Sequence, residues 1–236
     1  QASLGRLLAS RGTAEESALA ARCLREAAEH GHPRAQAGLG FLCLAGPAGA
    51  GGPEEAMRWL SKAAAQGDAR AVTGLGDCYA NGLGVPQDDA AASAWYARAA
   101  EAGDVVAQTN LGLLCAQGRG PPGAGGEAAA AWFGKAAEAG GVSAQLNLGA
   151  LHEAGEGVER DDAAAAAWYR RAAEQGSPEA RTRLAVLLLQ GRGVPEDRAE
   201  AERWLALAAA QGEPDAQEIL EDLAEEEEEE EDWEVQ

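Results

Sequence analysis

Residues 71–103 read AVTGLGDCYANGLGVPQDDAAASAWYARAAEAG, and residues 144–176 read AQLNLGALHEAGEGVERDDAAAAAWYRRAAEQG. Both stretches carry Ala, Leu-Gly, a Gly-x-Gly-Val turn, an acidic pair, Trp-Tyr, Ala-Ala and a final Gly at the same relative positions. Self-similarity of this kind within one chain is the sequence signature of a repeat architecture. We therefore looked for the same markers in the rest of the sequence.

The repeat runs through nearly the whole chain of 236 residues. Tryptophans recur at intervals of 36, 37, 36 and 36 residues, at Trp59, Trp95, Trp132, Trp168 and Trp204. A glycine follows each tryptophan by eight residues, and Gly31 precedes this series at the same interval. Eight residues after each of these six glycines stands a leucine; the repeat leucines are Leu39, Leu75, Leu111, Leu148, Leu184 and Leu220. The one longer interval lies in residues 118–127 (GRGPPGAGGE), where we expect a loop because loops accept insertions at little cost.

Each period is predicted to hold two helices joined by a glycine-rich turn. The first helices are expected over residues 35–44, 71–80, 107–116, 144–154 and 180–190, because their apolar residues share one face at helical spacing. The second helices begin near an acidic pair and end at a glycine that can act as a left-handed C-cap. We expect each tryptophan to fill the junction between helices, and the glycine after each repeat leucine to admit a neighbouring backbone.

This pattern resembles the Sel-one-like repeat family, which is related to the tetratricopeptide repeats. The resemblance implies an all-α, right-handed α-solenoid of about five to six 36-residue helix-turn-helix repeats, with a concave face lined mainly by first helices. Leu4-Gly5 is taken as part of a partial N-terminal repeat, and residues 215–225 as a C-terminal capping helix. Such repeats must stack because one helix pair cannot bury its apolar face alone. We divide the chain into a repeat solenoid, residues 1–224, and an acidic tail, residues 225–236.

Composition excludes several classes of function. A net charge of −20 argues against nucleic acid, whose phosphates require a basic surface. No run approaches the roughly 18 apolar residues of a membrane span, so we expect a soluble chain without a transmembrane segment, although a membrane complex could be its partner. The chain does not begin with Met, so its N-terminus is expected to be processed or truncated. Thiols without CxxC spacing favour an intracellular or organellar location, which leaves the compartment open.

Several motifs that suggest catalytic or ligand sites are better explained by the repeat. GLGV joins two helices and lacks the following lysine of a phosphate loop. The acidic pairs fit helix N-caps and lie on successive repeats, so they do not converge on one site; they are Asp88-Asp89, Asp161-Asp162 and Glu196-Asp197. We therefore predict no cofactor, no metal and no enzymatic activity. A β-lactamase-like hydrolase of the cysteine-rich bacterial branch is kept as an alternative, although this chain lacks the paired cysteines of those proteins.

Binding is the remaining class. By resemblance to tetratricopeptide geometry, ligand-facing positions lie two and one residues before each repeat leucine, and two, five and six residues after it. These positions hold Phe41, Leu44, Thr73, Asp77, Asn81, Thr109, Asn110, Leu113, Gln117, Asn147, Glu153, Thr182, Arg183, Val186 and Gln190. Asn110 and Asn147 could hold a partner's backbone amides, and the single basic residue, Arg183, disfavours an acidic C-terminal peptide. The mixed polar and apolar set suits a helix or an extended segment of another protein; the alternative is that these residues are merely solvated.

Glu225 to Asp232 form an unbroken acidic run. Such a run is expected to repel itself and stay disordered. We predict that it binds a basic protein surface with Trp233 as an apolar anchor; the alternatives are a solvated tail or a continued helix. The sequence thus predicts a non-catalytic scaffold or adaptor, a peripheral subunit or assembly factor of a larger complex. A purely structural subunit docked by its convex face and tail is the alternative.

Overall fold

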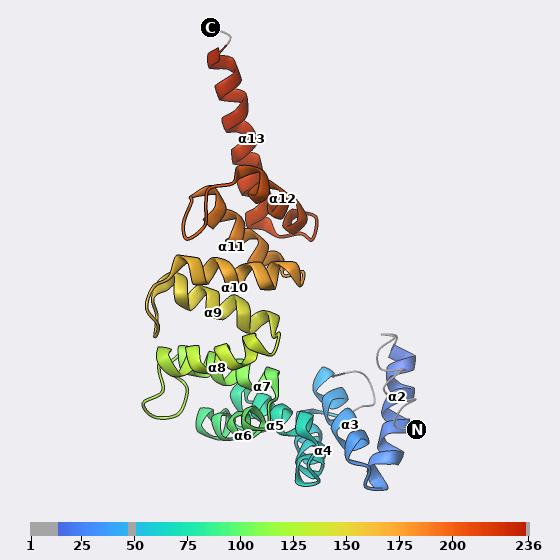
Figure 1. Ribbon diagram of the computed structural model, residues 1–236. Helices are drawn as coiled ribbons and strands as arrows, with labels where there is room; N and C mark the ends of the chain where they lie inside the picture. Colours follow the sequence, from blue (N-terminus) through green and yellow to red (C-terminus); the bar gives the residue numbers. More distant parts are fainter. Residues whose placement is uncertain (1–13, 47–50, 235–236) are drawn as a thin grey trace. The chain divides into compact units, whose positions relative to one another are not determined.

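The computed structural model describes the backbone of residues 14–46 and 51–234, and the side chains of residues 18–46 and 51–226 (Figure 1). The chain forms two compact units, Gln1–Gly125 and Gly126–Gln236. The division falls inside the 118–127 loop, where the extra residue was predicted. Every regular element in the described ranges is an α-helix, which confirms the all-α prediction.

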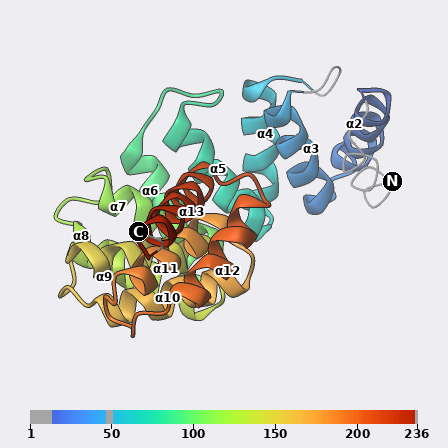
Figure 2. The same ribbon diagram turned by 90° about the horizontal axis from the view of Figure 1, so that it is seen from above.

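The first unit holds the predicted first helices of three periods. Its helices are α2 (Ala14–Glu29), α3 (Pro33–Ala45), α4 (Pro53–Ala65), α5 (Ala69–Asn81), α6 (Asp89–Glu101) and α7 (Val105–Ala116). Each helix packs mainly against the next one along the chain, so that α3 lies between α2 and α4 (Figures 1 and 2). The first helices α3, α5 and α7 overlap the predicted ranges. The expected partial helix at Leu4-Gly5 lies outside the described residues.

The second unit continues the same order. Its helices are α8 (Gly126–Glu138), α9 (Val142–Ala154), α10 (Asp162–Glu174), α11 (Pro178–Leu189), α12 (Arg198–Ala209) and α13 (Pro214–Glu234). The helix α13 is longer than the predicted capping helix and continues through the acidic run, where the sequence predicted disorder. The boundary placed between residues 224 and 225 therefore lies inside a helix.

Helix ends follow the predicted capping chemistry. The carboxylate of Asp88 accepts a hydrogen bond from the backbone N–H of Ala91 at 2.9 Å, and Asp161 and Asp197 cap α10 and α12 in the same way. Such side chains satisfy N–H groups that have no partner within the helix. The glycines that end the second helices all have φ between 86° and 98°, which confirms them as left-handed caps; they are Gly31, Gly67, Gly103, Gly140, Gly176 and Gly212.

The residue after each tryptophan, and not the tryptophan itself, fills the core. Tyr96, Phe133 and Tyr169 are 3%, 1% and 0% exposed, whereas the five tryptophans that mark the repeat are only half-buried. The prediction that tryptophan fills the junction is met only in part: Trp59 and Trp204 pack against the buried clusters but keep part of their surface exposed. One step along a helix turns a side chain by about 100°, so the next residue points further into the core. The tryptophan lies at the edge of the buried face. In four of the five periods a basic residue three positions later covers its ring, as Lys135 covers Trp132 at 4.1 Å.

The glycine after the repeat leucine makes room for a side chain. A Cβ atom on Gly40 would lie 2.7 Å from Cγ of Leu60, and one on Gly76 would overlap the Tyr96 ring. The expected close approach of a backbone is instead found at the second glycine of the turns. A Cβ atom on Gly193 would overlap the backbone of Asp162, at the start of the preceding second helix.

Polar contacts also join successive periods at a spacing of 30 residues. Arg119 donates to both carboxylate oxygens of Asp89, at 2.6 and 3.0 Å. Arg192 forms the same bidentate contact with the carboxylate of Asp162, at 3.0 and 3.2 Å. Asp89 and Asp162, the second acids of their pairs, thus each link one period to the next, with a geometry that arginine forms well with carboxylates.

Candidate partner-binding surface

The structure separates the predicted ligand-facing residues by exposure. The threonines two residues before the repeat leucine are buried, with exposed fractions of 6%, 8% and 7% for Thr73, Thr109 and Thr182, so they offer little surface to a partner. The half-buried residues are Phe41, Leu44, Asp77, Asn110, Leu113, Asn147, Glu153 and Val186, and the exposed ones are Asn81, Gln117, Arg183 and Gln190. The Trp233 side chain lies outside those that the structure describes.

In the first unit, three side chains from successive helices meet. Asp77 of α5 accepts at its Oδ1 atom from the Tyr96 hydroxyl of α6 at 2.7 Å and from Nδ2 of Asn110 of α7 at 3.0 Å. We call these three residues the Asp77 cluster. The contact between α5 and α7 shows that first helices of neighbouring periods present their side chains on one surface.

Hydrogen bonds within the chain also engage the two asparagines that were expected to hold a partner's backbone. Nδ2 of Asn110 donates to Asp77, and Nδ2 of Asn147 donates to the Ser143 carbonyl at 2.7 Å.

The Asp77 carboxylate is held without a cation. Burial raises the pKa of Asp77 and outweighs the hydrogen bonds from Tyr96 and Asn110, which lower it; the charge of Asp104 raises it further. Burial and the nearby Asp77 carboxylate likewise raise the pKa of Tyr96. Among the described residues, no lysine or arginine forms an ion pair with Asp77. The cluster therefore places a desolvated carboxylate beside neutral donors only.

Tyrosine and carboxylate occur together within the repeats. Tyr96 bonds to Asp77, and Tyr169 bonds to Glu153 at 2.9 Å. In three other periods the tyrosine position holds Leu60, Phe133 or Leu205. The first helices of those periods have no acid at either carboxylate position, which they fill with Phe41, Leu44, Leu113, Ala116, Val186 and Leu189. A buried hydroxyl therefore appears where an acceptor is available, in line with the cost of leaving it unpaired.

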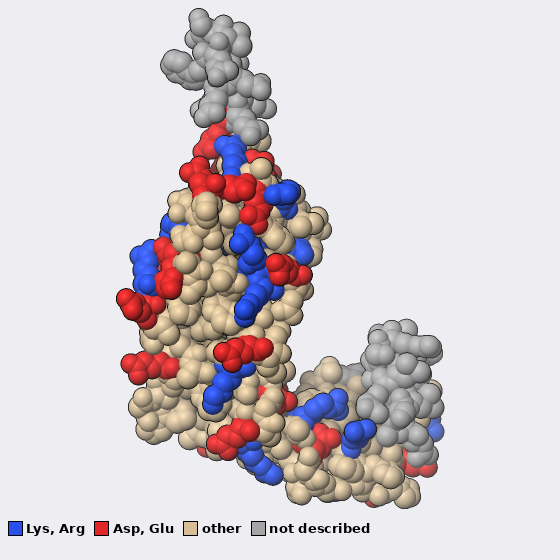
Figure 3. Space-filling model, in the orientation of Figure 1, with Lys and Arg blue, Asp and Glu red and all other residues tan. Residues whose placement is uncertain are grey.

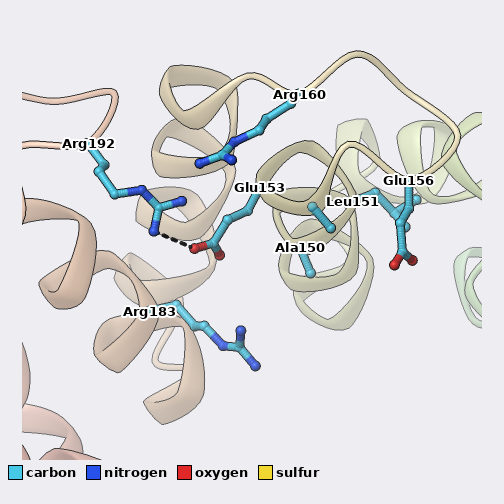
Figure 4. A pocket seen from close by; sticks show the side chains of 8 residues that line it. Ala150, Leu151, Glu153, Glu156, Arg160, Arg183 and Arg192 are labelled. Atoms are coloured by element: carbon cyan, nitrogen blue, oxygen red, sulfur yellow. Dashed lines mark ion pairs between the residues drawn. The ribbon is translucent and has the colours of Figure 1, made fainter.

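In the second unit the tyrosine–carboxylate pair does have a cation. Arg192, from the turn before α12, forms an ion pair with Glu153 at 3.2 Å and another with Asp162 at 3.0 Å. Glu153 faces an open pocket of about 450 Å³ (Figure 4), lined by Ala150, Leu151, Glu153, Ala154, Glu156, Arg160, Arg183 and Arg192. Because the lining mixes three arginines with two glutamates, the pocket is polar without being purely cationic.

Sequence reasoning found part of these sites. It selected Asp77, Asn110, Glu153 and Arg183, and the structure joins the first two in one cluster and the last two in one pocket. It missed Arg160 and Arg192, which come from turns, and it gave Tyr96 no role in a site. The 30-residue spacing of arginine and aspartate in residues 89–119 and 162–192 was the available signal.

The remaining metal-ligating and nucleophilic side chains that the structure describes do not form a recognisable catalytic site. No group of three potential metal ligands occurs among the described residues, and none of their helices is long and apolar enough to cross a membrane. Burial raises the pKa values of Cys43 and Cys78 to about 11, which disfavours the reactive thiolate form. Lys/Arg and Asp/Glu side chains intermingle on the visible face of each unit (Figure 3).

The chain belongs to the Sel1 repeat family. Six copies of the Sel1 repeat match, at residues 1–32, 33–68, 69–104, 105–141, 142–177 and 178–213. Proteins of this family are generally scaffolds for protein–protein interaction without catalytic activity. None of the curated proteins compared with the chain matches it.

Solved structures agree with this assignment. A Sel1 repeat protein from Oxalobacter formigenes is 32% identical, with a TM-score of 0.80 over 93% of this chain and 64% of its own. A protective antigen of uropathogenic Escherichia coli is 31% identical, with a TM-score of 0.78 over 92% of this chain and 46% of its own. This chain thus spans about half to two-thirds of those relatives. An immunity protein from Pseudomonas aeruginosa, 21% identical with a TM-score of 0.54 over 85% of this chain and 76% of its own, shares the fold.

Proposed function

We propose that this chain is a non-catalytic scaffold that serves as a peripheral subunit or assembly factor of a larger complex. It binds a helical or extended segment of a partner along the first helices of its repeats. The observation that carries this proposal is the contrast between constant and variable positions on those helices. The repeat leucine stays the same from period to period, whereas the half-buried position two residues later holds Phe41, Asp77, Leu113, Ala150 or Val186.

Variation at the surface on a constant core supports recognition, because repeat proteins bind partners along the face that their stacked helices share. In the first unit, the Asp77 cluster spans α5, α6 and α7 with polar groups beside half-buried Leu113. In the second unit, a polar pocket of about 450 Å³ borders α9 and α11. Polar groups set around apolar ones are characteristic of protein interfaces.

The acidic end of α13 supplies a second element of the proposal. Glu225 and Glu226 are exposed, and the acidic residues that follow extend the same helix. A helical row of carboxylates attracts a basic surface over about one Debye length, roughly 10 Å at ordinary ionic strength. We propose that this segment, with Trp233, contacts a basic patch on the partner.

The test is a selection of random displayed peptides against the chain, followed by affinity measurements with purified variants. One variant combines Asn110→Ala, Leu113→Glu and Asn147→Ala on the first helices. The control is Arg203→Glu on the second helix α12, where Arg203 is exposed. We expect selected peptides to lose affinity for the triple variant by at least about tenfold, and to bind the control as they bind the wild type. Peptides that bind the triple variant and the wild type equally would contradict the proposal.

A further inference from the structure

We propose that Asp77 is the receptor for a basic side chain, arginine or lysine, on the partner segment. This inference rests on the proposed scaffold function and names the chemistry that its first unit recognises. The argument depends on the position of Asp77 in the repeat, on the two groups that hold it, and on a comparison with Glu153.

Two residues after Leu220, in the terminal helix α13, stands the exposed Asp222. In the four other periods, whose first helix is followed by a second helix, the position of Asp77 is apolar and holds Phe41, Leu113, Ala150 and Val186. All of these positions are half-buried, so a carboxylate there loses hydration that an apolar residue would not need. Such an acid costs stability unless its hydrogen bonds and charge are satisfied, and burial indeed raises the pKa of Asp77.

The hydrogen bonds satisfy one oxygen of Asp77 and orient the other. Tyr96 and Asn110 both donate to Oδ1, and among the described residues no donor reaches Oδ2. The carboxylate is therefore fixed by α6 and α7 while its second oxygen can still accept. A partner donor would find this oxygen already positioned, which lowers the entropic cost of forming the contact.

In the second unit, a tyrosine–carboxylate pair is joined by an arginine. There Glu153, which accepts from Tyr169, also forms an ion pair with Arg192 at 3.2 Å. The corresponding arginine of the first unit stands 73 residues earlier, at Arg119. Arg119 instead donates to Asp89, Gln117 and the carbonyl of Ala80. Asp77 stands two residues after its repeat leucine and Glu153 five residues after its own, so the two acids reach their tyrosines from successive turns of the first helix. Among the described residues, the Asp77–Tyr96 pair thus lacks the cation that the Glu153–Tyr169 pair has.

A partner that covers Asp77 and leaves it ionised has to supply that cation. Covering the carboxylate removes its remaining water, and an ionised group left unpaired in a dry interface is strongly unfavourable. Neutral donors already occupy Oδ1, so a further neutral donor would leave the charge uncompensated. Arginine or lysine offers both a hydrogen bond and the opposite charge.

The experiment uses arginine- or lysine-containing peptides from the selection described above, each also made with citrulline in place of arginine or norleucine in place of lysine. Binding is measured to the wild type and to Asp77→Asn, which keeps an acceptor for Tyr96 and Asn110 but removes the charge. The matched control is Glu101→Gln, an equally conservative change at an exposed carboxylate at the end of the second helix α6, outside the ligand-facing positions. A double variant, Asp77→Leu with Tyr96→Phe, copies the residues Leu113 and Phe133 of the next period and tests the same site without an unpaired hydroxyl.

We expect Asp77→Asn and the double variant to weaken binding of the basic peptide by about tenfold, and Glu101→Gln to leave it unchanged. The neutral peptide should bind the wild type and Asp77→Asn alike. If selected peptides depend on Asn110, Leu113 or Asn147 but have no basic residue, or bind Asp77→Asn as tightly as the wild type, the inference is wrong and the scaffold function stands. If no peptide is selected, or none depends on the first helices, the scaffold function itself fails.

Discussion

Gly149 of α9 lies so close to Tyr169 of α10 that a Cβ atom on the glycine would be 2.6 Å from Cε1 of the ring. Tyr169 is fully buried and bonds to Glu153, so it cannot easily move aside. We predict that Gly149→Ala lowers the free energy of unfolding by about 1–3 kcal/mol, the usual cost of overpacking a core. Denaturant titration followed by circular dichroism measures this change.

Gly134 provides the control because it is also a helical glycine, in α8, with no atom within 4 Å of the Cβ position. Gly134→Ala should stabilise the protein by about 0.5–1 kcal/mol, since alanine is the better helix former. If both variants change stability in the same direction, the packing role assigned to Gly149 would be wrong.

Trp132 and Phe133 should contribute unequally to the free energy of unfolding. Phe133 is 1% exposed, and we predict that Phe133→Ala costs about 3–5 kcal/mol. Trp132 is half-buried under Lys135, so Trp132→Ala should cost clearly less despite removing the larger ring. If denaturant titration shows that both variants lose the same free energy of unfolding, Trp132 contributes to the core as much as Phe133 does.

These two cases show what the sequence could and could not predict about the fold. The period, the helix pairs and the caps follow from Leu, Gly and Asp at fixed intervals, because helical spacing and capping are local properties. The sequence did not show that Phe133 is buried and Trp132 only half-buried. Both are large aromatic residues, and the neighbouring helix determines where the buried face ends. The length of α13 was missed because the local charge rule omits helix propensity, which is favourable for glutamate.

The Arg192–Asp162 contact predicts a specific dependence of stability on pH. Hydrogen bonds from Arg192 and then from Arg160 lower the pKa of Asp162 below its ordinary value of 3.8. A lowered pKa means that the ionised acid stabilises the fold above the unfolded pKa, and that this contribution is lost as pH falls through the folded pKa. Arg192→Gln should therefore destabilise the protein near neutral pH, and the difference from the wild type should shrink below about pH 4.

Arg203→Gln is the matched control, because Arg203 donates only to a carbonyl of its own helix among the described contacts. Its unfolding midpoint should follow that of the wild type at every pH. A difference between Arg192→Gln and the wild type that stays constant from neutral to acidic pH would show that packing of the arginine, and not its charge, holds the two turns together.

The candidate site was predictable only in its helical part. Asp77 and Asn110 were found because they occupy fixed offsets from the repeat leucine. Arg192 was missed because it lies in a turn, and its pairing with Glu153 depends on how one repeat stacks on the next. Long-range contacts of this kind are absent from local pattern rules, although the repetition of Arg119–Asp89 and Arg192–Asp162 at 30 residues carries the information.

The acidic end of α13 should contribute to binding and not to stability. Ile219, Leu220 and Leu223 pack against the second unit's core, whereas Glu226 meets Arg198 only at 3.8 Å with 66% of its side chain exposed. Because exposed ion pairs contribute little, removing residues 225–236 should change the free energy of unfolding by less than about 0.5 kcal/mol. The same truncation should abolish binding of a lysine-rich peptide, measured by fluorescence anisotropy.

A charge-neutral tail separates electrostatic attraction from anchoring by Trp233. Replacing each Glu and Asp of residues 225–232 by Gln or Asn preserves length while it removes the charge. If attraction dominates, this variant should bind the lysine-rich peptide as weakly as the truncated chain does, and wild-type binding should weaken as salt rises from about 50 to 200 mM. If the neutral variant retains wild-type affinity and Trp233→Ala loses it, the apolar anchor and not the acidic run holds the partner.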